Sequence, residues 1–312
     1  MFRKLCVPVV NESLSRAAAK AAISLAQRLD AEVLLTNLYA LPLLHFSQDA
    51  DSVRQELRSD SLALLEQLAD YARQHEIRVS VLPLEVEGGA VAATIAKIAE
   101  DERCDMIVLG THARTGLNRL LLGSVAEAVT RYSSLPVLLY RSDTAKPFSC
   151  ERILVALDGF ESSLAALEAA HQFARQLPAA IDVLHVVPDV LVYSDPMLAT
   201  LDTDRYTTHF AEYGKSVLAK AEMSLSDISN KTIMLEQAKG RRIADVILEH
   251  AKTNQNDLVV LGTHGYSGLE RLLLGSVAQA VAHHATVPVL LVRQTLPIKN
   301  PDAPLQLQTK PL

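Results

Sequence analysis

Short apolar runs alternate along the chain with longer segments in which apolar residues recur every three or four positions. In the second half the short runs are rich in β-branched residues and bounded by polar ones, as buried parallel strands are. They cover residues 153–157, 183–187, 233–235, 258–261 and 289–292. The longer segments carry an apolar stripe that suits helices packed on a sheet. They cover residues 162–177, 206–225, 241–253 and 276–284.

Strands that alternate with helices predict right-handed βαβ crossovers and an open sheet with helices on both faces. We therefore predict an α/β fold in which each half of the chain forms a doubly wound five-stranded parallel sheet, flavodoxin-like or half-Rossmann in kind. Ligands of such sheets bind beyond the carboxyl ends of the strands, where the strand order reverses. Functional residues are expected just after the first and fourth strands.

The two halves of the chain repeat each other. Residues 110–129, GTHARTGLNRLLLGSVAEAV, and residues 262–281, GTHGYSGLERLLLGSVAQAV, are identical at 15 of 20 positions. A spacing this long indicates a duplicated domain, because solenoid and propeller units repeat every 20 to 50 residues or so. We expect domains at residues 1–144 and 151–295, followed by a proline-rich flexible tail at residues 296–312.

Composition narrows the class of protein. Hydrophobic residues make up 49% of the 312 residues and aromatic ones only 4%, which suits aliphatic helices on a parallel sheet. The formal charge of -6 comes without long runs of one sign, so no nucleic-acid partner is expected. Apolar runs are too short for a membrane span or a signal-peptide core.

The three cysteines bear on location and chemistry. Cys6, Cys104 and Cys150 lack the spacing of a metal site and are interpreted as buried, inert thiols. So few cysteines favour a reducing compartment. Together with the missing signal peptide, they predict a cytoplasmic location.

A spaced set of glycines follows the fourth predicted strand of the second half. Gly262 is followed by Gly265 and, after nine residues, by Gly275 and Ser276, which begin the last helix. Glycine lets the backbone approach a ligand or adopt positive φ, and helix N-terminal amides bind phosphate oxygens. Neither a P-loop nor a dinucleotide site is expected, because Gly-Lys-Ser/Thr and Gly-x-Gly-x-x-Gly are both missing at the required places.

Both halves resemble universal stress protein domains, and the two resemblances cover nearly the whole chain. The ATP-binding branch of that family has the motif Gly, two residues, Gly, nine residues, Gly, then Ser or Thr. Gly262, Gly265, Gly275 and Ser276 match this motif, and the flanking ILVALDG and VLGTHGYSGLERLLLGSVAQAV extend the match. The resemblance implies an adenine nucleotide α-hydrolase-like fold whose second half binds ATP, alone or with Mg.

The resemblance also implies which residues bind the nucleotide. The base pocket would be formed by Ala156, Leu157, Asp158 and Val186. The ribose and the first phosphate would be flanked by Leu261, Gly262, His264 and Gly265. The phosphate chain would be held by Gly275, Ser276 and Val277. No residue is assigned a catalytic role, and no metal site within the protein is expected.

Asp158 is the acidic residue of the proposed site. A carboxylate just after a buried strand can accept hydrogen bonds from ribose hydroxyls or an adenine amino group, or it can cap the following helix. The first half has Val10 at this position and Ala113 in place of the middle glycine. Valine offers no acceptor, and alanine costs about 1 kcal/mol where positive φ is needed. The first site is therefore expected to be weakened, empty or adapted to another ligand.

The combined hypothesis is a stress-response protein that binds ATP or another adenine nucleotide in its second half and acts as a nucleotide-dependent regulator. One alternative is a slow ATPase or autophosphorylating enzyme, although no general base accompanies Ser276 at a defined spacing. Another is an interaction module that binds no nucleotide and keeps its glycine loops for reasons of fold.

The resemblance further implies that residues 137–140 pair with residues 289–292, the last strands of the two halves. Such pairing would make the chain an internal pseudo-dimer and protect two sheet edges. A homodimer of the whole chain is left open. Arg241 and Arg242 stand near a helix start, where positive charge opposes the helix dipole, and are predicted to face a phosphate or a partner.

Overall fold

The computed structural model describes residues 2–40, 50–86, 90–111, 123–141, 149–189, 203–263 and 274–293. The predicted alternation of strands and helices is confirmed in both halves. The first half contains β1 (Lys4–Pro8), α1 (Ser13–Leu29), β2 (Glu32–Tyr39), α2 (Ala50–Gln74), β3 (Val79–Glu85), α3 (Val91–Asp101), β4 (Met106–Gly110), α4 (Ser124–Tyr132) and β5 (Val137–Tyr140). The second half contains β6 (Arg152–Ala156), α5 (Glu161–Gln176), β7 (Ala180–Val187), α7 (Thr203–Ser224), β8 (Lys231–Gln237), α8 (Ile243–Thr253), β9 (Leu258–Gly262), α9 (Ser276–His284) and β10 (Val289–Val292).

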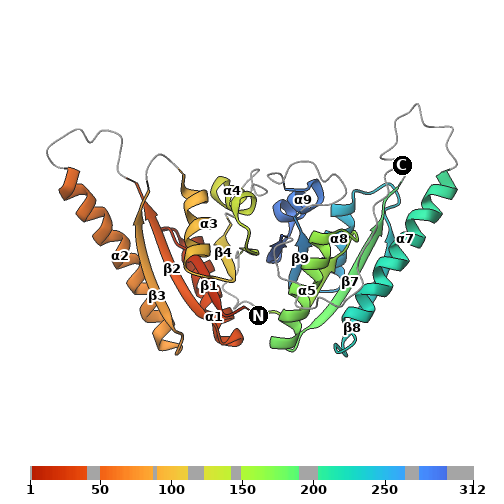
Figure 1. The fold of residues 1–312 in the computed structure, drawn as a ribbon, viewed down its shortest axis with the longest axis horizontal. Helices are drawn as coiled ribbons and strands as arrows, with labels where there is room; N and C mark the ends of the chain where they lie inside the picture. Colours follow the sequence, from red (N-terminus) through yellow and green to blue (C-terminus); the bar gives the residue numbers. More distant parts are fainter. Residues whose placement is uncertain are drawn as a thin grey trace.

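The described strands form one ten-stranded sheet in the order β3-β2-β1-β4-β5-β10-β9-β6-β7-β8 (Figure 1). Within each half the strands are parallel, and the order 3-2-1-4-5 is that of the first five Rossmann strands. The halves join where β5 and β10 pair antiparallel, with Leu138 opposite Leu290. The predicted pairing of the last strands is thus confirmed. Both strands are buried throughout, so neither leaves an open edge.

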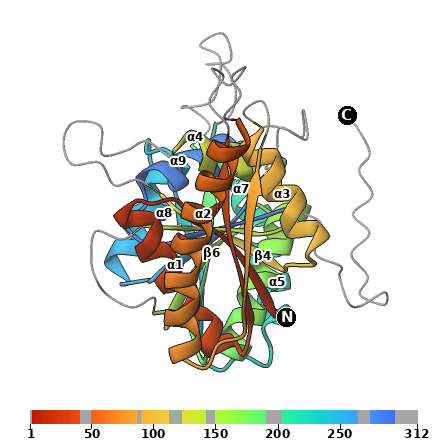
Figure 2. The ribbon, with the colours of Figure 1, turned by 90° about the vertical axis from the view of Figure 1, so that its left-hand side faces the viewer.

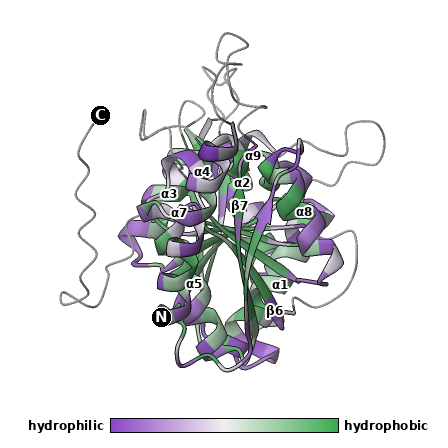
Figure 3. Ribbon diagram, turned by 90° about the vertical axis from the view of Figure 1, so that its right-hand side faces the viewer, coloured by the Kyte–Doolittle hydropathy of each residue, from purple (hydrophilic) through white to green (hydrophobic). Residues whose placement is uncertain are grey.

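Helices cover both faces of the sheet, as expected for a doubly wound fold. One core receives buried residues from α1, α2, α5 and α7, and the other from α3, α4, α8 and α9. Strand side chains alternate between the two, so that Leu5 and Val7 join the first core and Cys6 the second. Figure 2 shows α1 and α3 on opposite sides of the strands, and Figure 3 shows the hydrophobic strands in the middle of the molecule.

The two halves share packing beyond the paired strands. The ring of Phe2 lies 4.7 Å, between centroids, from the ring of Phe173 on α5, and the core on this face draws residues from both halves. Arg141, just after β5, donates a hydrogen bond from Nη1 to the carbonyl oxygen of Ala285 at the end of α9, at 2.9 Å. The arrangement is that of an internal pseudo-dimer.

Candidate functional site

The predicted site residues gather at the carboxyl edge of the second half. β6 lies between β7 and β9, and its last residue, Ala156, is level with Leu184 on one side and Leu261 on the other. The chain leaves β6 to form α5 on one face of the sheet, and it leaves β9 to form α9 on the other. The strand order therefore reverses at β6, where ligands of doubly wound sheets bind.

The turn between β6 and α5 is built around Ser163 and Asp158. The Ser163 hydroxyl accepts the amides of Asp158 at 3.3 Å and Gly159 at 3.2 Å, and donates to the carbonyl of Phe160 at 2.9 Å. Asp158 Oδ1 accepts the amide of Phe160 at 3.0 Å, while Phe160, rather than Asp158, is the N-cap of α5. Asp158 Oδ2 has no hydrogen bond with any described residue. One oxygen of this half-buried carboxylate thus supports the turn, and the other is open to a ligand.

Helix α7 closes over this turn, which the sequence analysis did not predict. The Tyr213 hydroxyl donates to the Asp158 carbonyl at 3.3 Å. Gly159 has φ +87°, and a methyl group on it would lie 2.4 Å from the same hydroxyl. Gly159 is therefore required both by its conformation and by the close approach of α7. A tyrosine followed by a glycine inside a helix was the available signal, because a helical glycine marks a place where another group comes close.

His185 fastens β7 to the same turn. Its Nδ1 donates to the carbonyl of Leu157 at 2.8 Å, and Gly214 of α7 leaves room for the imidazole ring. In the first half Asn37 takes the equivalent position and donates from Nδ2 to the carbonyl of Val9 at 2.6 Å. The hydrogen bond is thus a shared feature of both copies. Burial lowers the pKa of His185, and the Leu157 carbonyl and the Asp158 carboxylate only partly oppose this shift.

The lowered pKa of His185 predicts that the folded protein loses stability in acid. Because the folded-state pKa lies below the unfolded value of about 6.5, the neutral ring contributes its full stability above that pH. The contribution is lost as the pH falls through the folded pKa. His185→Asn introduces the residue that the first half has at this position. When the pH is lowered from about 7 to about 5, this variant should lose less unfolding free energy than the parent chain. Urea titrations of both proteins at both pH values would measure the difference.

The control for this prediction is His209→Asn, since His209 is exposed on α7. The control should keep the pH dependence of the parent chain. An unchanged pH dependence in His185→Asn would contradict the prediction, because the acid sensitivity would then arise elsewhere.

On the side of β6, Val186 has a backbone edge that pairs with no described strand. The last pair between β6 and β7 joins Ala156 to Leu184, and the amide of Leu157 donates to the Leu184 carbonyl at 2.9 Å. Successive residues of a strand direct their backbone groups to opposite edges, so Val186 faces the same side as Leu184. Since β6 has ended there, no described strand pairs with the N–H and C=O of Val186 on this side. The edge offers one donor and one acceptor to a planar ligand.

The missing side chain of Gly262 makes room for a neighbouring helix. A methyl group at this position would lie 2.6 Å from the backbone carbon of Ser162 and from the backbone nitrogen of Ser163. Gly262 does not have positive φ either. The missing side chain therefore lets the end of β9 contact the first turn of α5.

Helix α9 begins without a capping side chain. Gly275 is its N-cap, and the amide of Gly275 donates to the Thr263 carbonyl at 2.7 Å. This amide was expected to bind a phosphate, but it is already hydrogen-bonded within the protein. The amides of Ser276, Val277 and Ala278 have no partner among the described residues, since their intrahelical acceptors would precede the helix. Ser276 is exposed and Val277 half-buried. The helix dipole adds partial positive charge at this end.

A continuous set of contacts connects Asp158 with the start of α9. Asp158 is bound to Ser163, and Ser163 contacts Gly262 at the end of β9. Thr263 follows Gly262 and accepts the amide of Gly275. The acidic residue and the helix N-terminus thus flank the same edge of the sheet.

Two of the predicted binding residues, His264 and Gly265, lie outside the described residues. So does Ala113, which replaces Gly265 in the first half.

The first half keeps the backbone of this site and changes its chemistry. Val10 replaces the aspartate and is 47% exposed, while its amide still donates to the Ser15 hydroxyl at 2.9 Å. Glu127 lies in the first turn of α4, where α9 has Gln279 and no acidic residue. A carboxylate there repels an anionic ligand from the positive end of the helix. The aligned repeats contain this difference, which the sequence analysis did not use.

Arg241 and Arg242 are engaged by carboxylates of their own half. Arg241 forms ion pairs with Glu236 at 2.8 Å and Glu249 at 2.6 Å, and Arg242 pairs with Asp245 at 2.8 Å. These pairs satisfy charges that would otherwise oppose the dipole of α8. The predicted role in binding a phosphate or a partner gains no support from this geometry.

Among the residues that the structure describes, no helix is long and apolar enough to cross a membrane. Within the same ranges, no group of three or more His, Cys, Asp or Glu side chains is arranged to hold a metal ion.

Two parallel α/β halves joined through their last strands, each with a glycine at the end of its fourth strand and another at the start of its last helix, define a tandem protein of the doubly wound class. The family model described as "Universal stress protein family" matches residues 1–141 and again residues 150–293. The chain belongs to the universal stress protein family, in its tandem two-domain form.

Relatives and solved structures agree with this assignment. A universal stress protein of Mycobacterium tuberculosis is 30% identical over 215 residues, which are 65% of this chain and 65% of that protein. The chain therefore spans just under two thirds of that relative. Universal stress protein YxiE of Bacillus subtilis is 33% identical over 149 residues, 46% of this chain and 98% of YxiE. The crystal structure of a universal stress protein from Archaeoglobus fulgidus shares the fold, with a TM-score of 0.68 at 18% identity, over 93% of this chain and 98% of that one.

Proposed function

We propose that the second half of this protein binds ATP or another adenine nucleotide at the carboxyl edge of β6, β7 and β9. The observation that carries the proposal is the grouping, at one edge, of three features that have no partner among the residues that the structure describes. They are the Oδ2 atom of Asp158, the backbone edge of Val186 and the first amides of α9. Each matches a different part of a nucleotide.

The parts can be assigned by their chemistry. The donor and acceptor of Val186 suit the edge of an adenine ring, and the open oxygen of Asp158 suits ribose hydroxyls. The amides of Ser276 and Val277, with the Ser276 hydroxyl, suit phosphate oxygens at a positive helix end. In the same proposal Ala156, Leu157 and Leu261 line the base and ribose, and His264 and Gly265 flank the first phosphate. A Mg ion would be carried by the phosphates.

The first half is proposed not to bind the same ligand. Val10 removes the acceptor for the ribose, and Glu127 places negative charge at the start of α4. The chain would then carry one nucleotide beside the joint between its halves and act as a nucleotide-dependent regulator in a stress response. The proposal includes a cytoplasmic location, which the three free cysteines favour.

Equilibrium dialysis of the intact chain against labelled ATP tests the proposal. We expect about one equivalent of ATP at saturation, since the repeat contains one complete set of binding features. Excess unlabelled AMP should displace the label and excess GTP should not, because the backbone edge of Val186 distinguishes the two base edges. Absence of binding, or full displacement by GTP, would count against the assigned site.

A further inference from the structure

The peptide group that joins Asp158 to Gly159 is held at both ends by side chains of α5 and α7. Its carbonyl oxygen accepts the Tyr213 hydroxyl of α7 at 3.3 Å, and its N–H donates to the Ser163 hydroxyl of α5 at 3.2 Å. Gly159 has φ +87°, and glycine adopts positive and negative φ with similar ease. This peptide is therefore the part of the turn that rotates most readily, and two side chains fix its orientation.

The equivalent turn of the first half has a different hydrogen-bond pattern. There the Glu12 amide donates to the Val10 carbonyl at 2.7 Å, so the turn satisfies this carbonyl within itself. Asn11, the middle residue of that turn, does not have positive φ. In the second half the matching amide, that of Phe160, donates instead to the side chain of Asp158 at 3.0 Å. The two copies thus show two arrangements of one turn, with the carbonyl bonded to its own turn in one and to α7 in the other.

The arrangement of the second half decides what the Asp158 carboxylate does. Because the carbonyl is bonded to α7, the Phe160 amide is accepted by the side-chain Oδ1 atom, as when an aspartate closes a turn two residues on. This bond restrains the carboxylate, and Oδ2 has no hydrogen bond with any described residue. In the arrangement of the first half, the carbonyl would take the Phe160 amide and the carboxylate would lose its restraint.

Helix α7 has the residues that reach this turn, and α2 does not. Aligning the buried positions of the two helices places Asp60 where α7 has Tyr213, and Ser61 where it has Gly214. An ionised aspartate has no hydrogen to donate. A methyl group on Gly214 would lie 2.5 Å from the ring of His185, and the ring of Tyr213 lies edge-on to the same imidazole, with centroids 6.2 Å apart. The turn and the helix that contacts it therefore differ together between the two copies.

We propose that Tyr213 is a positioning residue for nucleotide binding, an inference that rests on the function proposed above. Its hydroxyl holds the peptide between Asp158 and Gly159 in the orientation that leaves Oδ2 of the carboxylate for the ribose hydroxyls. Loss of the hydroxyl releases the turn to the arrangement of the first half, in which the carboxylate is unrestrained. Tyr213 therefore sets, through Asp158, how strongly the site responds to the ribose.

The test is isothermal titration calorimetry of the intact chain with ATP and with 2′,3′-dideoxy-ATP. The parent chain should bind ATP more tightly, because only ATP offers ribose hydroxyls to Asp158. Tyr213→Phe keeps the ring and removes the hydroxyl, so the affinity for ATP should fall about 2- to 10-fold, the range for one hydrogen bond between neutral groups. The ratio of the two affinities should fall with it. A general loosening of α7 would weaken both ligands and leave the ratio unchanged.

Tyr206→Phe is the matched control, since Tyr206 is an exposed tyrosine on the same helix. It should keep the affinity for ATP and the ratio of the parent chain. A fall in the ratio equal to that of Tyr213→Phe would overturn the inference, because the effect would not depend on the contact with Asp158.

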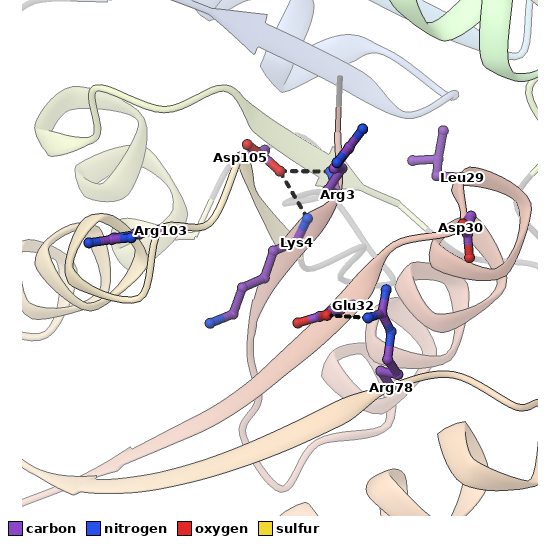
Figure 4. Close-up of a pocket in the computed structure, with 8 residues that line it drawn as sticks. All are labelled: Arg3, Lys4, Leu29, Asp30, Glu32, Arg78, Arg103 and Asp105. Atoms are coloured by element: carbon purple, nitrogen blue, oxygen red, sulfur yellow. Dashed lines mark hydrogen bonds and ion pairs between the residues drawn. The ribbon is translucent and has the colours of Figure 1, made fainter.

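A cavity at the amino-terminal edge of the first half provides a control for unspecific attraction of phosphates. Its volume is about 590 Å³, and its lining includes Arg3, Lys4, Arg78 and Arg103 together with three acidic residues (Figure 4). Arg78 is paired with Glu32 at 2.9 Å. Arg103→Ala should leave the ratio of the two affinities unchanged. A ratio that falls in Arg103→Ala as in Tyr213→Phe would place the nucleotide at the cavity and overturn the inference.

Hydrogen exchange of the ligand-free chain tests the same contact without a nucleotide. Peptides that cover residues 157–163 should exchange faster in Tyr213→Phe than in the parent chain, and peptides that cover residues 9–15 should not change. Unchanged exchange at 157–163, or an unchanged affinity ratio, would overturn the inference and leave the proposed function standing. A parent chain that does not bind ATP would instead remove the proposed function, and this inference with it.

Discussion

Replacing Asp158 with alanine is expected to weaken ATP binding by the intact chain roughly 10- to 100-fold, the range for losing a hydrogen bond to a charged group. The open Oδ2 atom of this carboxylate is the acidic acceptor assigned to the ribose, and Oδ1 supports the turn through the amide of Phe160 at 3.0 Å. Both contributions are lost in Asp158→Ala. Isothermal titration calorimetry with ATP would measure the change in affinity.

Asp158→Asn separates the two contributions, because an amide oxygen can still accept the Phe160 amide while the negative charge is gone. It should bind more tightly than Asp158→Ala and more weakly than the parent chain. The matched control is Val10→Ala, at the equivalent position of the first half, which should leave ATP binding unchanged. Parent-like affinity in Asp158→Ala would mean that the nucleotide is not held at this edge as assigned.

Replacing Gly262 with alanine is expected to reduce the free energy of unfolding by about 2 to 3 kcal/mol, as overpacking of a rigid contact does. The added methyl would lie 2.6 Å from backbone atoms of Ser162 and Ser163, which cannot move away as a flexible side chain could. The end of β9 and the start of α5 would have to separate. Urea denaturation followed by circular dichroism gives the change in unfolding free energy.

Gly110→Ala is the matched control, since Gly110 ends β4 as Gly262 ends β9. There the methyl would lie 3.0 Å from Ala18 Cβ and 3.1 Å from the Leu14 carbonyl, so the cost should be no more than about 1 kcal/mol. Equal destabilisation by the two substitutions would show that the closer contact at Gly262 has no energetic consequence.

These expectations change how the glycine motif is interpreted. Gly262 belongs to the motif associated with nucleotide binding, yet its missing side chain accommodates α5. A loss of ATP binding in Gly262→Ala would therefore follow from displaced secondary structure and would not identify a direct contact. Asp158 is the better probe of the ligand, because one of its oxygens has no structural partner among the described residues.

The amino-acid sequence by itself determined the duplicated α/β architecture and the place of the candidate site. Strand and helix periodicities are local properties of the chain, and the repeat relates Gly110 to Gly262 and Val10 to Asp158 without coordinates. The sequence also predicted that the last strands of the halves pair, through the family resemblance, and β5 and β10 do so.

Only the tertiary structure decided what each residue contacts, because such contacts join segments distant in the chain. It showed that Gly262 makes room for a helix, that the Gly275 amide is already bonded, and that Tyr213 of α7 reaches the β6 turn. Composition and spacing report which groups are present, whereas the contact of Gly262 with α5 depends on the pairing of β6 with β9, a long-range event that local patterns do not encode.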